Sequence, residues 1–305
     1  MSDIKKILST VDTSINGFML KVPAVEKAMY EEILKLTKEL KIDSRGRIRN
    51  TIDNYKILSE LRTRLERVVF TSEYKKASKK LLKSFDDINK VTNDYFATFA
   101  TSPTATTQDI LKILRQESVN RTALYLGESG VNINVVSKVQ DILQTNITSG
   151  GSYAQMQSDM KAFIQGDAEN LGAFNKYANT FVVDGVNTYA RTYQTLLTED
   201  LNIEWYMYVG SLLETSRPWC KHMVDKRYIH KTELDTVLYD NVDGVEICSA
   251  EIPCNSKTKL PAGMKKDTTP QNLLVNAGGW NCGHKFIGVD SAVVPQHIKD
   301  KIKKR

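Results

Sequence analysis

Apolar side chains recur at helical spacing through most of the first hundred residues. The spacing predicts a helix over residues 24–41, a second over 48–69 and a third over 74–99. The break between the second and third helices, near residues 70–72, is short. We therefore expect these two helices to be the arms of a long antiparallel hairpin.

The middle of the chain continues the helical pattern. Helices are predicted from residue 107 to the glycines at 127 and 130, over 135–143, after a Gly-Gly turn at 150–151, and over 173–201. Ser152 follows that turn and is placed to cap the helix that carries Met156, Met160 and Ile164. The break at residues 101–104 is the best candidate for a domain boundary.

The pattern changes at residue 202. Strand-forming residues fill 203–213 and 285–289, and a short strand over 227–229 and a short helix over 231–239 lie between them. Residues 240–276 read as irregular, with little apolar material. The predicted fold is mainly α, with a long N-terminal helical hairpin and a small α+β C-terminal module. We divide the chain into a basic helical region (1–103), a helical middle region (104–201) and the C-terminal module (202–305).

Composition and charge exclude some classes of protein and favour others. No apolar run is long enough to span a membrane, and the N-terminal residues carry no secretory signal. The small number of cysteines favours a reducing compartment. The net charge is +6, and the basic excess lies within residues 1–100. A basic helical arm can bind DNA or an acidic protein. The pattern favours a solvated helix face, because aromatic residues do not alternate with the basic ones as stacking platforms would require.

Two short motifs carry the candidate chemistry. Residues 215–222 read Thr-Ser-Arg-Pro-Trp-Cys-Lys-His, and residues 278–284 read Gly-Gly-Trp-Asn-Cys-Gly-His. If each Cys-x-His pair is extended, its two side chains share one face, and the four can converge on a structural zinc ion. The candidate ligands are Cys220, His222, Cys282 and His284.

Other interpretations of these motifs stay open. Cys220 and Cys282 could form a disulfide, or could be buried as thiols beside Trp219 and Trp280. A catalytic thiolate–imidazole pair would need an oxyanion signal that the sequence lacks, so we expect no enzyme. Cys248 and Cys254 could replace either histidine as ligands. The metal, disulfide and buried-thiol interpretations each require the segments around 220 and 282 to be adjacent. We therefore expect Cys220 and Cys282 to lie in neighbouring segments, with His284 within reach.

The order of signals from about residue 108 onward resembles the Mu F-like minor head proteins of tailed bacteriophages, also called phage head morphogenesis proteins. The resembling pieces are the turn at 147–153, the long helix with Arg191, the strand at 205–210 with residues 215–220, and the closing residues 279–284. The chain departs from the family at Gly283, where a basic residue is common, and it adds Cys248 and Cys254.

The resemblance implies a structural protein of the virion, bound near the portal vertex inside the head. It implies the portal protein and capsid or scaffold proteins as partners, presence in the host cytoplasm during assembly, and a part in head assembly and in genome packaging or ejection. The alternatives are a DNA-binding accessory protein acting through the basic N-terminal arm and, as a third class, a Cys/His-based enzyme or toxin.

Overall fold

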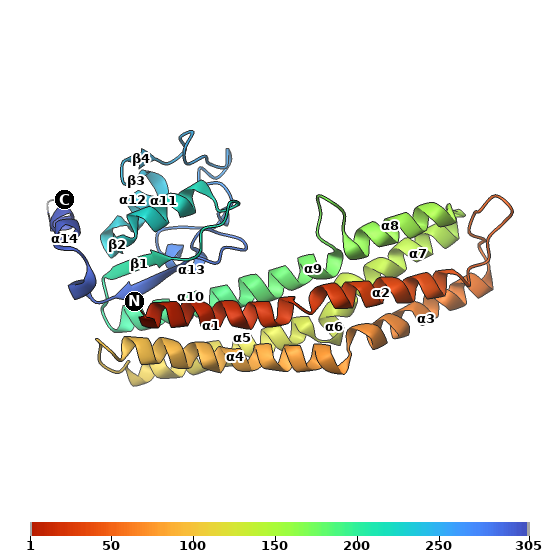
Figure 1. The fold of residues 1–305 in the computed structure, drawn as a ribbon, viewed down its shortest axis with the longest axis horizontal. Helices are drawn as coiled ribbons and strands as arrows, with labels where there is room; N and C mark the ends of the chain where they lie inside the picture. Colours follow the sequence, from red (N-terminus) through yellow and green to blue (C-terminus); the bar gives the residue numbers. More distant parts are fainter. Residues whose placement is uncertain (1, 304–305) are drawn as a thin grey trace. The chain divides into compact units, whose positions relative to one another are not determined.

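Helices dominate the structure, a computed structural model that describes residues 2–303. The first two hundred residues are almost entirely helical, as predicted (Figure 1). The helices are α1 (Ser2–Met19), α2 (Val22–Thr37), α3 (Ile52–Val69), α4 (Ser72–Phe96), α5 (Ala105–Leu126), α6 (Glu128–Val131), α7 (Ser137–Ser149), α8 (Tyr153–Gln165), α9 (Ala173–Ala178) and α10 (Gly185–Asp200). Two π-helical segments, η1 (Asn132–Val136) and η2 (Asn179–Asp184), continue α6 into α7 and α9 into α10.

Backbone contacts divide the chain into two compact units. Unit 1 comprises residues 1–12, 85–118 and 183–305, and unit 2 comprises 13–84 and 119–182. Each unit therefore combines segments that are far apart in the sequence, whereas the division expected from the sequence is consecutive. The break at residues 101–104 is the connection between α4 and α5, and both sides of it belong to unit 1.

Unit 2 is a bundle in which α2 packs against α3 and α8, and α3 also packs against α7 (Figure 1). The packed faces are helical stripes of buried side chains, as the periodicity predicted. They comprise Val25, Met29, Ile33 and Leu36 of α2, Ile57, Leu61 and Leu65 of α3, Val139, Leu143 and Ile147 of α7, and Met156, Met160 and Ile164 of α8.

A long N-terminal hairpin is present, but its arms are α2 and α3, and the expected pairing of residues 48–69 with 74–99 is wrong. The buried amide of Asn54 fixes the loop between the true arms. Its Oδ1 accepts from the Lys41 N–H (2.8 Å), and its Nδ2 donates to the carbonyls of Lys41 (3.0 Å) and Arg49 (2.6 Å). These bonds give protein partners to backbone groups of the loop that would otherwise be bonded only to water. They stabilise the loop between α2 and α3, and this longer loop is where the chain reverses.

The C-terminal module contains the predicted sheet. Its strands β1 (Trp205–Val209), β2 (Tyr228–His230) and β5 (Lys285–Val289) are ordered β2-β1-β5 and are antiparallel. In this register Tyr208 of β1 lies opposite Phe286 of β5. The mainly α class with a small α+β module is therefore confirmed.

The remaining elements of the module surround this sheet (Figure 1). They are α11 (Pro218–Lys226), η3 (Lys231–Glu233), α12 (Leu234–Tyr239), β3 (Asn241–Val242), β4 (Val245–Glu246), α13 (Leu273–Asn276), η4 (Ser291–Val293) and α14 (Gln296–Lys303). The stretch at 240–276 is not short of apolar anchors, contrary to expectation. Ile252, Leu260 and Leu273 from this stretch are buried in the same core as Trp219.

Within the described residues, no helix combines the length and the apolar character that crossing a bilayer requires.

Candidate functional site

Three of the four candidate ligands meet in the C-terminal module. Cys220 lies in the first turn of α11, and Cys282 and His284 lie just before β5. One potential ligand atom from each residue lies within 4.8 Å of the others, and all three side chains are buried. The expected proximity of Cys220, Cys282 and His284 is therefore confirmed. We call these three residues the Cys/His cluster.

His222 does not join the cluster. Residues 218–226 form a helix, whereas convergence of all four ligands required the Cys220–His222 pair to be extended. Two residues along a helix turn the side chain through about 200°, so His222 points away from Cys220. Its Nε2 lies 3.9 Å from a carboxylate oxygen of Glu251 instead.

Tyr208 of β1 completes the surroundings of the two sulfurs. Its hydroxyl donates to the Sγ of Cys220 (3.4 Å) and lies 4.0 Å from the Sγ of Cys282. Its ring stacks on the imidazole of His284, with the centroids 5.4 Å apart and the planes 5° from parallel. The Nδ1 of His284 in turn lies 3.6 Å from the Sγ of Cys282. The sequence indicated only that Tyr208 belongs to a strand, because no residue pattern near it shows that it contacts the cysteines.

Two glycines make room for the cluster. A Cβ added at Gly278 would lie 2.4 Å from the Sγ of Cys220 and 2.9 Å from the Sγ of Cys282. A Cβ added at Gly210 would lie 2.5 Å from the ring of His284. These distances are far inside van der Waals contact, so only glycine lets the backbone approach the ligand atoms this closely.

Arg191 of α10 holds the second motif in place. Its Nε donates to the carbonyl of His284 (3.0 Å), its Nη1 to the carbonyl of Val275 (3.3 Å), and its Nη2 to the carbonyl of Cys282. The side chain is only 2% exposed. Arg191 is therefore a scaffold residue whose hydrogen bonds go to backbone carbonyls.

A second arginine joins the two motifs directly. The Nη2 of Arg217, in the first motif, donates to the carbonyl of Trp280, in the second (2.7 Å). On the other flank, the carboxylate of Asp184 accepts from the N–H of Asn281 (2.6 Å). Residues 280–284 are therefore held from α10 and from the start of α11.

The protonation of the two thiols is linked. The hydrogen bond from Cys220 lowers the pKa of Cys282, and the hydrogen bond with His284 and the charge of Arg191 act in the same direction. The same bond to Cys282, together with burial, raises the pKa of Cys220. Without a bound cation, the pair therefore favours one thiolate on Cys282 and one proton on Cys220.

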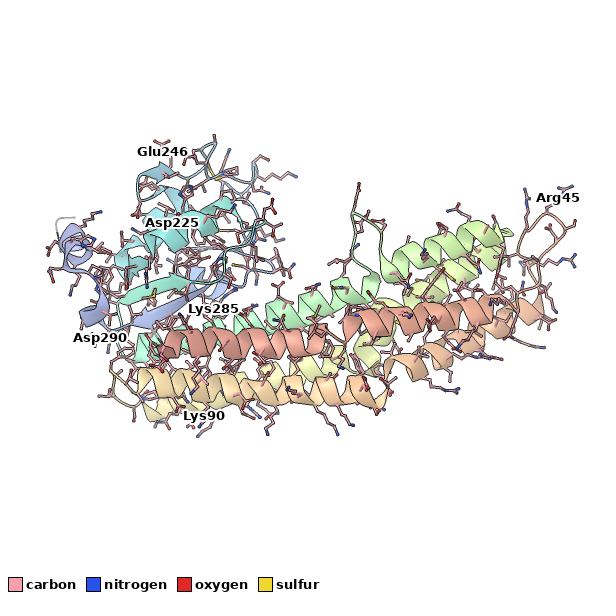
Figure 2. The ribbon with its side chains drawn as sticks, in the orientation of Figure 1. Arg45, Lys90, Asp225, Glu246, Lys285 and Asp290 are labelled. Carbon is pink, nitrogen blue, oxygen red and sulfur yellow. A yellow bond between two sulfur atoms is a disulfide. The ribbon has the colours of Figure 1, made fainter. Side chains whose placement is uncertain are left out.

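Lys285, next to the cluster and labelled in Figure 2, is fully buried. Its Nζ donates to the carbonyl of Gly283 (2.9 Å). Burial, and after it the charge of Arg191, lowers the pKa of Lys285 to about 7. The apolar pattern of residues 285–289 gave no reason to expect a buried ammonium group there.

The other two cysteines are not alternative ligands. Cys248 and Cys254 form a disulfide with each other, with a Cα–Cα distance of 4.7 Å, while Cys220 and Cys282 are free thiols. The expectation that Cys248 or Cys254 could replace a histidine is therefore wrong.

The two tryptophans of the motifs have different surroundings. Trp219 is buried, donates from Nε1 to the carbonyl of Val237 (2.8 Å), and packs edge-on against Tyr208. Trp280 is 53% exposed, and the ammonium group of Lys265 lies 4.9 Å from its ring centroid. Burial beside the cysteines holds for Trp219 but not for Trp280.

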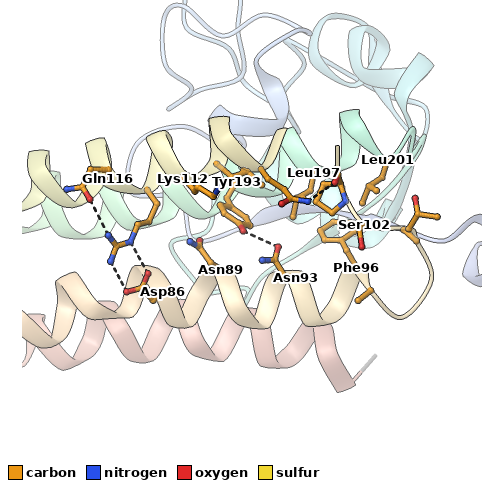
Figure 3. Close-up of a pocket in the computed structure, with 17 residues that line it drawn as sticks. Asp86, Asn89, Asn93, Phe96, Ser102, Lys112, Gln116, Tyr193, Leu197 and Leu201 are labelled. Carbon is orange, nitrogen blue, oxygen red and sulfur yellow. Dashed lines mark hydrogen bonds and ion pairs between the residues drawn. The ribbon is translucent and has the colours of Figure 1, made fainter. Parts of the chain in front are cut away.

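Unit 1 also contains an open groove of about 860 Å³ between α4, α5 and α10 (Figure 3). Most of the polar side chains that line it bond to one another or to neighbours. Arg115 donates to both carboxylate oxygens of Asp86 (2.8 Å each), and Tyr193 donates to Asn93 (3.0 Å). Few polar groups of the groove are therefore free to bind a ligand. The Cys/His cluster is the stronger candidate site.

Comparisons with protein-family models, with curated proteins and with solved structures find no match to this chain. Only the fold and the site therefore describe the class of protein. The chain is mainly helical, and its small C-terminal module contains a buried Cys/His cluster.

Proposed function

We propose that the protein is a minor head protein of a tailed bacteriophage, a structural component of the virion bound at the portal vertex inside the head. In this role it takes part in head assembly and in genome packaging or ejection, with the portal protein and capsid or scaffold proteins as partners. It is made and assembled in the host cytoplasm.

The observation that carries the proposal is the convergence of three of the segments on which the resemblance rests. These three segments are separate in sequence, and they bond to one another around the Cys/His cluster: residues 215–222, the helix with Arg191 and residues 279–284. Signature residues that serve a structural purpose are more readily explained in a family of structural proteins than in an enzyme family. The burial of both sulfurs also disfavours a catalytic thiol, because a nucleophile must reach its substrate.

The test is direct association with a portal. The full chain is mixed with the portal protein encoded in the same genome, and the mixture is analysed by velocity sedimentation. We expect part of the chain to sediment with the portal oligomer at micromolar concentrations, since specific interfaces of standard size commonly bind at least this tightly. Separate sedimentation of the two proteins, with portal oligomers intact, would contradict the proposal.

A second candidate function, DNA binding, is favoured by one feature of unit 2. Five exposed lysines follow one another along the first half of α4, at positions 75, 76, 79, 80 and 83. Within residues 2–303, no carboxylate lies within ion-pair distance of any of these five ammonium groups, whereas Lys56 and Lys112 each pair with an aspartate. Such a row of unpaired charges is suited to a phosphate backbone.

The salt dependence of DNA binding tests this second function. If all five lysines contact phosphates, affinity for duplex DNA should fall on the order of several hundred-fold between 50 and 200 mM salt. Replacing the five lysines by Gln should abolish binding, and replacing the paired Lys56 and Lys112 should not. Equal binding by the two variants, or no binding at low salt, would rule the candidate out.

A further inference from the structure

We propose that Cys220, Cys282 and His284 bind one divalent cation of the zinc class, with the hydroxyl of Tyr208 at the fourth corner of a tetrahedron. Two thiolates and an imidazole are ligands that such a cation prefers. The inference goes beyond the proposed function and holds whether or not the chain binds a portal. It also differs from the four-ligand site expected from the sequence, because His222 is replaced by a tyrosine from another strand.

Two of three distances within the cluster lie close to the edges of a coordination tetrahedron, and the third is about 0.5 Å longer. Metal–sulfur bonds of about 2.3 Å and metal–nitrogen bonds of about 2.1 Å give a sulfur–nitrogen edge of about 3.6 Å, and an oxygen ligand gives a sulfur–oxygen edge of about 3.5 Å. The Sγ of Cys282 is 3.6 Å from the Nδ1 of His284. The Tyr208 hydroxyl is 3.4 Å from one sulfur and 4.0 Å from the other.

The three ligand side chains are almost fully buried. The exposed fractions are 1% for Cys220, 4% for Cys282 and 6% for His284. The Nδ1 of His284 is the ring nitrogen near the Sγ of Cys282, so Nδ1 would coordinate the ion. The Nε2, which has no hydrogen-bond partner within the described chain, would then carry the ring proton.

The surrounding residues preserve the space and the orientation that the three ligands need. Gly278 and Gly210 remove the Cβ atoms that would collide with the sulfurs and the imidazole. Arg191 binds the carbonyls of both Cys282 and His284, so two ligands on one short segment are fixed by one side chain. Metal sites are commonly oriented by such outer contacts.

Charge also favours a cation over an empty site. Two thiolates neutralise the two positive charges of the ion, which leaves a net neutral centre in a buried environment. Binding should release protons as the thiols become ligands.

The test uses the full chain purified without chelator under reducing conditions, with zinc measured by elemental analysis. We expect about one zinc per chain, and we expect Co²⁺ in its place to give a thiolate-to-cobalt charge-transfer band with the intense visible bands of tetrahedral geometry. Cys220→Ser, Cys282→Ser and His284→Ala should each lose the ion. His222→Ala and the double variant Cys248→Ser/Cys254→Ser, matched in residue type but outside the cluster, should retain it.

Tyr208→Phe tests the fourth corner separately. This variant should keep the ion but with affinity lower by about 10–100-fold and with shifted visible cobalt bands, because water replaces the phenol oxygen. If this variant has the same cobalt bands and the same affinity for the ion as the wild type, Tyr208 is not a ligand.

A measurement on the unmodified protein keeps the proposal falsifiable if a ligand variant fails to fold. Added Zn²⁺ should raise the thermal midpoint of the wild-type chain, and chelator should lower it. A midpoint insensitive to both, cobalt bound without a thiolate band, or a Cys220–Cys282 disulfide in the reduced preparation would each overturn the inference.

Discussion

Replacing Arg191 by Met should strongly destabilise the C-terminal module. Arg191 makes three hydrogen bonds to the carbonyls of Val275, Cys282 and His284, and it is almost fully buried. The methionine side chain fills a similar volume but donates no hydrogen bond. The substitution therefore leaves three carbonyls short of a partner and removes the positive charge that stabilises the Cys282 thiolate.

The magnitude follows from these contacts. A hydrogen bond from a charged donor contributes about 1.5–3 kcal/mol, and the burial of the guanidinium offsets part of the sum of three. Breaking a buried charged network by removing one partner typically costs about 3–5 kcal/mol, which is our expected loss. With a denaturant dependence of about 2 kcal/mol per M urea, the midpoint should fall by about 1.5–2.5 M.

The chain offers both the probe and the control. Its three tryptophans, at positions 205, 219 and 280, all lie in the C-terminal module, so fluorescence during urea unfolding reports on this module alone. Arg115→Met removes an arginine from the same unit, but its ion pair with Asp86 is at the surface. It should cost no more than about 1 kcal/mol. If the Arg191→Met variant lost no more stability than the Arg115→Met control, the clamping role of Arg191 would be refuted.

Three further predictions test other parts of the structure. Lys285 has a folded-state pKa of about 7 and an ordinary value of 10.5, so between these values the unfolded chain binds a proton that the folded chain does not. As the pH rises from 7 to 10, the unfolding free energy of the wild type should therefore increase by about 1.4 kcal/mol per pH unit more than that of Lys285→Met. Urea unfolding at several pH values measures both slopes, and equal slopes would contradict the lowered pKa of Lys285. Gly278→Ala should cost about 1–3 kcal/mol by pushing the sulfurs apart, whereas Gly283→Ala, with open space at its Cβ, should be near neutral in thermal melts. Ser152→Ala should cost about 1 kcal/mol in circular-dichroism unfolding, because its hydroxyl accepts from the Gln155 N–H at the start of α8, and no change would show that this cap is not needed.

The helices were predictable because their signals are local. The stripe of Met156, Met160 and Ile164 and the capping Ser152 predicted α8 from sequence alone, and the structure matches them. Strands β1 and β5 were found for the same reason, from short runs of strand-forming residues. α1 was not assigned, although Ile4, Val11 and Phe18 of its buried stripe follow helical spacing.

The pairing of the helices was not predictable, because it depends on contacts between distant segments. A short break between 69 and 72 suggested a reversal, but the reversal occurs in the longer loop that Asn54 fixes. The helix at residue 220 was missed for a different reason. The zinc interpretation took the Cys220–His222 pair as extended, whereas proline is common in the first turn of a helix, and here Pro218 begins α11.

The candidate site was predictable in part. The repeated Trp and Cys-x-His motifs singled out Cys220, Cys282 and His284, because these residue types at these positions suggested convergence. Tyr208 and Gly278 carry no such signal, since their importance lies in distances of 3.4 Å and 2.4 Å to a sulfur from other elements. The Cys248–Cys254 disulfide was missed because the sequence does not show that residues 248 and 254 are brought within bonding distance.

The measurement that tests the central claim most directly is the fate of phage particles made without this protein. The gene is interrupted by a nonsense codon in the phage that encodes it, and particles grown in suppressing and non-suppressing hosts are compared for protein content, packaged DNA and infectivity. A minor head protein at the portal vertex predicts that the chain is present in wild-type particles in few copies, and that its loss sharply lowers the yield of infectious, DNA-filled particles. Normal assembly, packaging and infectivity without the chain would contradict the account.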